Sequence, residues 1–173
     1  ILQFFRDKGY KIAVASSSTQ EQIRQRIEKV LCGFPYLVAE LNGKVIGYAY
    51  AGHFIPREAY YHCAEVSIYI SRENHRSGIG RMLYDALIGQ LRDQAITQIY
   101  ACIGVPEIED EYLTNNSAQF HAHMGFREVG RFCNSGKKFD RFYHMIWMEK
   151  IIGEHYDAKT SSWKRTQSGK QYE

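Results

Sequence analysis

The turn at residues 76–81, Arg-Ser-Gly-Ile-Gly-Arg, combines residue types that suit the binding of an anion. Gly78 and Gly80 carry no side chain, so a ligand can approach the backbone where the first N–H groups of a following helix lack intrahelical acceptors. The positive end of the helix dipole and the charges of Arg76 and Arg81 add to the attraction for a phosphate. A tight turn that holds nothing has the same spacing, so the glycines alone leave both interpretations open.

Two elements of different period must position this turn. Apolar side chains at every second position predict a strand from Glu65 to Ile70, with Glu65 itself on the polar face. From Ile79 onward the apolar positions follow helical spacing and predict one buried stripe. The expected members of that stripe are Ile79, Met82, Leu83, Ala86, Leu87 and Leu91.

The order strand, His-Arg-Ser-Gly-Ile-Gly, helix resembles the acetyl-CoA signature of the GNAT acetyltransferases. His75 stands where that signature usually has Gln or Arg, so the departure affects a side-chain contact and leaves the backbone cradle unchanged. Residues 34–70, 115–130 and 136–150 are similar to the corresponding segments of the phosphinothricin N-acetyltransferase branch. Four motifs in the same order make chance a poor explanation.

The resemblance implies a mixed α/β (α+β) fold of the GNAT type, with a mostly antiparallel central sheet flanked by helices. It implies one domain over residues 1–154, whose amino-terminal strand is missing, and a polar tail over 155–173. The strand from Gln98 to Ile103 is expected to splay from the Glu65 strand, so that the amide-rich arm of CoA pairs with the exposed backbone. By resemblance, acetyl-CoA contacts fall at Ile68, Tyr69, Ile70, Arg76, Ser77, Gly78, Ile79, Gly80, Arg81, Asn116 and Phe120.

Glu65 is the candidate general base for such a reaction. Acetyl transfer needs a neutral amine, but an aliphatic ammonium has a pKa near ~10 and keeps its proton at neutral pH. A partly desolvated carboxylate has a raised pKa and can take that proton directly or through a water. The family's corresponding Glu has this role. The alternative is a Glu at the edge of the sheet that pairs with an Arg.

His121 corresponds to a position where many GNAT enzymes carry a Tyr. Its imidazole could protonate the leaving thiolate, take part in shuttling the substrate's proton, or serve packing alone. His121 and His123 point to different sides of a helix, so no metal site is expected. Cys63 and Cys102 have no assigned base beside them, which favours direct attack over a covalent enzyme intermediate.

Arg57 and Tyr60 lie in a loop, Gly52–His62, just before the Glu65 strand. By resemblance both match substrate-side positions, and a guanidinium suits capture of a carboxylate or phosphinate. A solvated surface Arg is the alternative.

The remaining elements are predicted from local signals. Residues 1–10 read as the end of a helix, and a capped helix is expected from Ser18 or Thr19 to about Leu31. The segment 6–18 also resembles a strand of haloacid-dehalogenase-like hydrolases, but no aspartate nucleophile motif precedes it. A hairpin is expected of residues 36–40 with 44–51 across Asn42-Gly43, followed later by an acidic insertion at 105–114 and a helix over 115–124 capped by Asn115 or Asn116. Two strands are expected over 127–133 and 142–149, and the second should be covered on both faces. Lys137, Lys138 and Arg141 are expected in the loop between these strands.

Composition sets the outer limits. The net charge is only +3 and the pI is near 8.6, with the basic residues dispersed, so no nucleic-acid partner is expected. The four cysteines show no Cys-x-x-Cys spacing and predict reduced, mostly buried thiols, in keeping with a cytoplasmic location. No apolar run approaches the ~20 residues of a membrane helix, so no membrane partner is expected.

The sequence thus predicts an N-acetyltransferase that moves acetyl from acetyl-CoA to the primary amine of a small molecule, such as an amino acid, phosphinothricin or methionine sulfoximine. A homodimer is expected. Two alternatives stay open: acetylation of a protein amino terminus or lysine, and a non-catalytic CoA-binding module.

Overall fold

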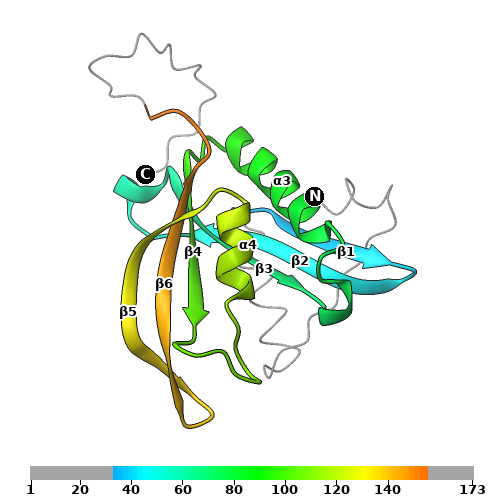
Figure 1. Ribbon diagram of the computed structural model, residues 1–173. Coiled ribbons are helices and arrows are strands. Elements are labelled where there is room, and N and C mark those ends of the chain that lie inside the picture. The colour runs from blue at the N-terminus through cyan, green and yellow to red at the C-terminus, as the bar shows by residue number, and fades with distance from the viewer. Residues whose placement is uncertain (1–32, 156–173) are drawn as a thin grey trace, which may run out of the picture.

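The computed structural model describes residues 33–155 of the 173-residue chain, and Figure 1 shows their arrangement. The helices predicted within residues 1–31, the segment compared with the hydrolases, and the predicted tail beyond residue 155 lie outside the described residues. The proposed division into a domain and a tail therefore stays a prediction.

Six strands form one sheet in the order β1-β2-β3-β4-β6-β5. Every neighbouring pair is antiparallel except β3 and β4, which run parallel. The strands are β1 (Tyr36–Leu41), β2 (Lys44–His53), β3 (Cys63–Ile70), β4 (Gln98–Val105), β5 (Arg127–Lys138) and β6 (Arg141–Ile151). The helices are η1 (Glu58–Tyr60), η2 (Arg72–Asn74), α3 (Ile79–Asp93) and α4 (Asn116–His123). This mixed, mostly antiparallel architecture is the predicted fold class.

The β1–β2 hairpin turns at the predicted dipeptide. Asn42 and Gly43 both have positive φ angles, 53° and 77°, which Asn and Gly adopt more readily than other residues. The hairpin brings Tyr36 opposite Tyr50 and begins the sheet with an antiparallel pair, as predicted.

The main core lies between α3 and one face of the sheet. Alternate side chains of β2, β3 and β4 point into it, among them Ala49, Val66 and Ala101. The buried positions of α3 are Leu83, Tyr84, Leu87, Ile88 and Leu91. Met82, expected in the buried stripe, is instead 60% exposed. The buried face of α3 is centred on Leu87, so Met82 points outward. The predicted stripe was therefore placed too far round the helix, on the side of Met82.

The β5–β6 hairpin projects beyond the rest of the sheet (Figure 1). It turns at Phe139 and Asp140, which have φ angles of 53° and 56°. Lys137 and Lys138 therefore belong to β5 and Arg141 to β6, and their predicted placement in a loop was wrong. Phe142 is 60% exposed, so the expectation that both faces of this strand are covered fails near the turn.

The cysteines differ from the prediction in burial. Cys63 is buried, whereas Cys102 and Cys133 are exposed, and all three are free thiols. The apolar runs around Cys102 and Cys133 predicted burial. However, Cys102 lies on the face of β4 opposite the core, and Cys133 lies on the edge strand β5, where only one side has a neighbouring strand.

Candidate active site

The parallel pair β3–β4 comes apart after three residue pairs. Cys63, Ala64 and Glu65 pair with Gln98, Ile99 and Tyr100, and no pairing follows. From this point the two strands diverge, as Figure 1 shows. The edge of β3 from Val66 to Ile70 that would face β4 therefore has no partner strand among the described residues. The predicted splay is confirmed, and the fork exposes backbone N–H and C=O groups that an extended amide-containing ligand can pair with.

The turn that follows β3 is held in shape by its own side chains. His75 Nε2 lies 3.0 Å from the carbonyl oxygen of Ile70, and the Ser77 hydroxyl donates to the carbonyl of Asn74 at 2.6 Å. Gly78, directly before α3, has a left-handed φ of 83°. The exposed His75, which stands at the position of the family's usual Gln or Arg, thus contacts the carbonyl at the end of β3.

The backbone of this turn presents free donors. The N–H groups of residues 76–81 donate to no acceptor within residues 33–155; the first α3 bond runs from Met82 N to Gly78 O. Arg76 has a positive φ of 62°, and consecutive residues that alternate in hand aim their N–H groups into one concavity. Arg76 and Arg81 are exposed beside it. The geometry matches a cradle for a phosphate at a helix N-terminus.

Gly80 lies against a side chain of α4. A Cβ at Gly80 would sit 3.0 Å from Phe120 Cε2 and 3.8 Å from Ile68 Cδ1. Three of the predicted cofactor-binding residues, from β3, α3 and α4, are therefore brought together at the cradle's inner side. Close packing, as well as access for a ligand, explains why Gly stands at position 80.

Not every predicted cofactor residue converges there through its side chain. Ile68 and Ile70 pack against the core, while Tyr69 points to the opposite face, is 55% exposed and stacks on Tyr48 at 4.9 Å. Asn115 is the N-cap residue of α4, one of the two predicted positions, and Asn116 begins the helix, but the Asn115 side chain makes no capping hydrogen bond. The N–H of Asn116 lies 3.4 Å from Thr114 Oγ1 instead.

Glu65 lies at the fork on the face opposite α3. Its carboxylate has no hydrogen bond or ion pair with any residue in the described part of the chain, so the alternative of a structural Glu–Arg pair finds no support there. Partial burial raises the pKa of the Glu65 carboxyl above its ordinary value. Burial, together with the negative charge of Glu65, also raises the pKa of the nearby Cys102 thiol. The site therefore favours a proton acceptor and disfavours a thiolate nucleophile.

Aromatic side chains cover the sheet beside Glu65. Phe54 stacks on Tyr100 with ring centroids 4.0 Å apart, and Trp147 and Tyr60 meet Phe54 edge-on at 5.5 and 6.4 Å. The predicted substrate residue Tyr60 is thereby joined to the strand pair that carries Glu65. Arg57, the residue just before η1, is exposed. Sequence reasoning missed Phe54, Tyr100 and Trp147 because they come from three segments distant along the chain.

His121 is buried, with only 3% of its surface exposed. Its Nδ1 lies 2.7 Å from the carbonyl oxygen of Ser117, and its Nε2 lies 2.7 Å from the hydroxyl of Tyr84. A carbonyl only accepts, so Nδ1 carries the proton and Nε2 accepts from Tyr84. Burial lowers the pKa of His121. Tyr84 was missed by sequence reasoning, although its place in α3, next to Leu83 and four residues before Ile88, predicts a buried position.

No group of three or more His, Cys, Asp or Glu side chains within residues 33–155 is arranged to hold a metal ion. In the same part of the chain, no helix is both long enough and apolar enough to cross a membrane.

Several known proteins are similar to this chain. Residues 3–147 match the model of the acetyltransferase (GNAT) domain. A phosphinothricin N-acetyltransferase of Alcaligenes faecalis is 37% identical over 132 residues, which cover 76% of this chain and 64% of that protein. The chain therefore spans slightly less than two thirds of that relative.

Two solved structures are similar in fold and sequence. One is a GNAT superfamily phosphinothricin acetyltransferase from Sinorhizobium meliloti in complex with AcCoA, with a TM-score of 0.70 and 31% identity over 80% of this chain and 72% of that one. The other is a ribosomal-protein-alanine N-acetyltransferase from Brucella melitensis, with a TM-score of 0.68 and 34% identity over 79% of this chain and 80% of that one.

Proposed function

The chain belongs to the GNAT acetyltransferase family, and from this premise we propose that it transfers acetyl from acetyl-CoA to the primary amine of a small molecule. The observation that carries the proposal is the fork between β3 and β4, with Glu65 at its apex and the free N–H groups of residues 76–81 at its far end. One end suits a pyrophosphate, and the other suits proton removal from an amine.

The residues present fit acetyl-CoA. The cradle at residues 76–81 would hold the pyrophosphate through backbone N–H groups, with Arg76 and Arg81 adding charge. The unpaired edges of β3 and β4 would pair with the amide groups of the pantetheine arm. Phe120 and Ile68 would form the apolar wall beside Gly80. Acetyl-CoA supplies the activated acetyl group as a thioester.

Glu65 would act as the general base. Its raised pKa makes the carboxylate a better proton acceptor, and the amine attacks only after its ammonium proton has moved to Glu65. The new C–N bond forms as the C–S bond breaks, and the sulfur leaves as the CoA thiolate. The nitrogen then loses its second proton to give the amide, and the thiolate takes up one proton to give free CoA. Direct attack is favoured over transfer through Cys102, because that thiol has a raised pKa and is seldom ionised.

Protonation of the leaving thiolate by His121 stays a prediction. Both ring nitrogens are already engaged, one by Ser117 and one by Tyr84, and the ring is buried. These contacts favour the packing alternative, in which His121 and Tyr84 hold α4 against α3. Because a free thiol has a pKa near ~8.5, the thiolate needs only modest help from any acid.

The acceptor is an amino acid or an analogue such as phosphinothricin or methionine sulfoximine. Arg57 would bind its carboxylate or phosphinate, and the cluster of Phe54, Tyr60, Tyr100 and Trp147 would exclude water around the amine. The name of the Alcaligenes relative supports this class of acceptor.

Acetylation of a protein amino terminus is a second candidate, favoured by the similarity to the ribosomal-protein-alanine N-acetyltransferase from Brucella melitensis. A thiol-release assay with amino acids, phosphinothricin, methionine sulfoximine, polyamines and short peptides separates the candidates. Turnover with a small amine supports the proposal, turnover with peptides alone supports the second candidate, and no turnover despite acetyl-CoA binding supports a non-catalytic module.

Two accompanying proposals concern the whole protein. A homodimer in the cytoplasm is expected from the resemblance and from the free thiols of Cys63, Cys102 and Cys133. Light scattering on a size-exclusion column measures the mass of the protein in solution, and a mass of one chain would contradict the homodimer.

A further inference from the structure

The acidic segment 106–114, for which the sequence suggests no function, is an ordered part of the fold. It connects β4 to α4 and contains Glu107, Glu109, Asp110 and Glu111. One carboxylate of the segment organises its backbone: Asp110 Oδ1 accepts from the N–H groups of Tyr112 and Leu113, each at 2.8 Å. Glu109 accepts from the N–H of Asn115 at 2.8 Å, so the segment also fixes the start of α4.

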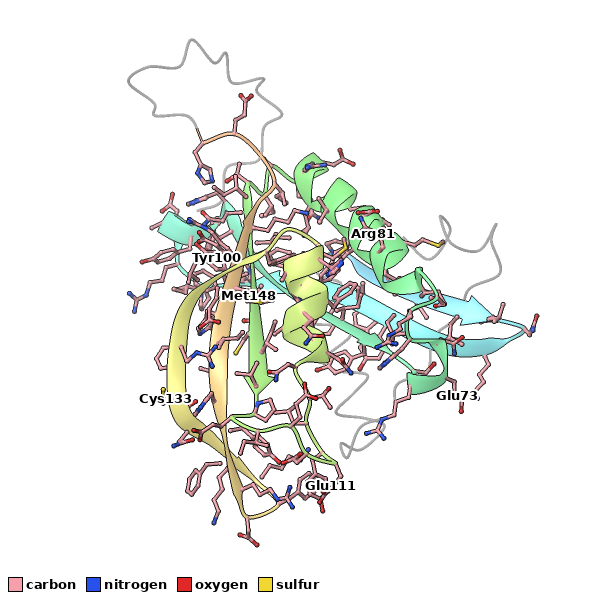
Figure 2. All side chains as sticks on the ribbon, viewed as in Figure 1. Glu73, Arg81, Tyr100, Glu111, Cys133 and Met148 are labelled. Atoms are coloured by element: carbon pink, nitrogen blue, oxygen red, sulfur yellow. The ribbon has the colours of Figure 1, made fainter. Side chains whose placement is uncertain are left out.

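The β5–β6 hairpin holds the segment from the other side. The Tyr143 hydroxyl donates to Asp110 Oδ2 at 2.9 Å, and Arg141 lies 3.0 Å from the same oxygen. Arg141 also reaches Glu111 at 3.2 Å, and Figure 2 shows Glu111 beside the turn of the hairpin. Burial alone would raise the pKa of Asp110, but its hydrogen bonds lower it to about 2, so the carboxylate stays charged at neutral pH. We call the contacts of Asp110 with Arg141 and Tyr143 the Asp110 clamp.

A second contact shows which face of the sheet the segment covers. Core-facing residues of β4 are Ile99, Ala101, Ile103 and Val105, so Tyr100, Cys102 and Gly104 face the other side, where Glu65 lies. A Cβ at Gly104 would lie 3.6 Å from Leu113 Cδ2. Leu113 therefore covers Gly104 on the face of the sheet where Glu65 lies. Met145 pairs with Gly104, so Tyr143, two residues before Met145, lies on that same face.

From these contacts we propose that Leu113, held in place by the contacts of Asp110 with Arg141 and Tyr143, forms the distal wall of the acceptor site and limits the length of the amine that the enzyme accepts. The proposal rests on the proposed acetyltransferase function and deepens it. Gly104 lies four residues beyond Tyr100, the residue paired with Glu65, which at 3.3 Å per residue is about 13 Å along β4. An acceptor that presents its amine to Glu65 and extends along β4 meets Leu113 at about that distance.

This wall favours compact acceptors over peptides. A free amino acid is shorter than ~13 Å, about four extended residues, so it ends before Leu113. A peptide that follows β4 would have to pass the segment, which the Asp110 clamp prevents from moving aside. Side chains of the wall therefore set the ratio of kcat/KM for an amino acid to kcat/KM for a peptide, and leave acetyl-CoA binding unchanged.

The test compares Leu113→Ala with a matched variant of the same segment. Ile108 is 83% exposed, so Ile108→Ala removes a similar side chain without touching the wall. With the full chain, kcat/KM is measured for the best amino acid and for tetra- and hexapeptides that begin with it. Leu113→Ala is expected to raise the relative kcat/KM of the peptides about tenfold, with KM for acetyl-CoA unchanged, whereas Ile108→Ala changes neither.

Tyr143→Phe provides a second readout, because it removes one bond of the clamp and keeps the ring. It is expected to raise the relative kcat/KM of the peptides in the same direction. If the wild-type chain turns over no amine, the proposed function fails. If the wild-type chain is active but Leu113→Ala and Tyr143→Phe, both folded by thermal melting, keep the wild-type ratio, the wall is refuted while the proposed function stands.

Discussion

Glu65 and Tyr100 are the last residues through which β3 and β4 pair. Beyond them the two strands separate, so the candidate base lies where the sheet opens rather than along an edge. Beyond this pair, β3 and β4 are not paired with each other in the described part of the chain. Phe54 stacks on Tyr100, the residue that pairs with Glu65. The proposed function assigns proton removal and thioester binding to the two sides of this gap.

Replacing Glu65 by Gln should lower kcat by about 10²- to 10⁴-fold, because the neutral amide cannot accept the ammonium proton. KM for acetyl-CoA should change little, because no cofactor contact is assigned to Glu65. Steady-state thiol release measures both constants. Glu128→Gln is the control, since Glu128 pairs with Arg131 on the remote edge strand; an equal loss in this control would show that charge alone matters.

The pH dependence of kcat tests the same assignment. Burial raises the pKa of Glu65, so the wild-type rate should rise with pH as the carboxyl loses its proton, above the ordinary range of a Glu. The raised pKa also means that folding disfavours the charged form, so Glu65 reduces stability above its folded pKa. Glu65→Gln should therefore lack this acidic limb and should unfold at a temperature no lower than the wild type. An unchanged limb in the variant would overturn the assignment.

Gly80→Ala should raise KM for acetyl-CoA. The new Cβ would lie 3.0 Å from Phe120 Cε2, so the ring, which belongs to the proposed cofactor site, must shift to make room. Gly89→Ala in the same helix meets nothing within 4 Å and should stabilise the fold by roughly 0.5–1 kcal/mol, through higher helix propensity. Acetyl-CoA titration by calorimetry, with thermal melts of both variants, makes the comparison; equal affinities would show that Phe120 does not line the site.

Tyr84→Phe should destabilise the protein by about 1–3 kcal/mol, because it leaves His121 Nε2 buried without a donor. If Tyr84 and His121 only hold α4 against α3, kcat changes little at saturating substrates. Urea unfolding and kcat are measured together. A kcat loss of about 10²-fold or more in His121→Gln, without loss of stability, would instead support His121 as the acid.

Stability should fall as the pH drops below about 6.5, the ordinary pKa of a His. The pKa of buried His121 is lowered in the fold, so the neutral ring stabilises the native state fully above the unfolded pKa, and this contribution is lost as the pH falls through the folded pKa. A His121→Leu variant, which does not titrate, should show a shallower decline between pH 7 and 5 in thermal melts. An identical slope would mean that other groups control the decline.

Arg57→Ala should raise KM for acceptors that carry a carboxylate by about 10- to 100-fold, the range expected for one charge-assisted pair. KM for the matching amino acid amide, which has no negative charge, should stay the same. Comparing the two acceptors in wild type and variant isolates the carboxylate contact. If both acceptors weaken equally, Arg57 supports the loop and does not bind the substrate.

Local chemistry determined what the sequence alone made predictable. Asn42-Gly43 specifies a tight turn because both residues tolerate positive φ angles, and the change of period between Glu65 and Ile79 marks the strand, turn and helix. Gly78, whose backbone is left-handed, is likewise a feature that the local sequence predicts. Each of these features depends on interactions within a few residues.

The tertiary structure decided which distant side chains meet. Tyr84 bonds to His121 across 37 positions, and Phe54 stacks on Tyr100 from a loop before β3. Contacts of this kind depend on the register of the sheet and the rotation of α3, which no local pattern encodes; the error at Met82 has that origin. The role proposed for the acidic segment depends on the contact between Asp110 and Tyr143. The sequence does not predict this contact, because a carboxylate alone does not reveal which donors will surround it.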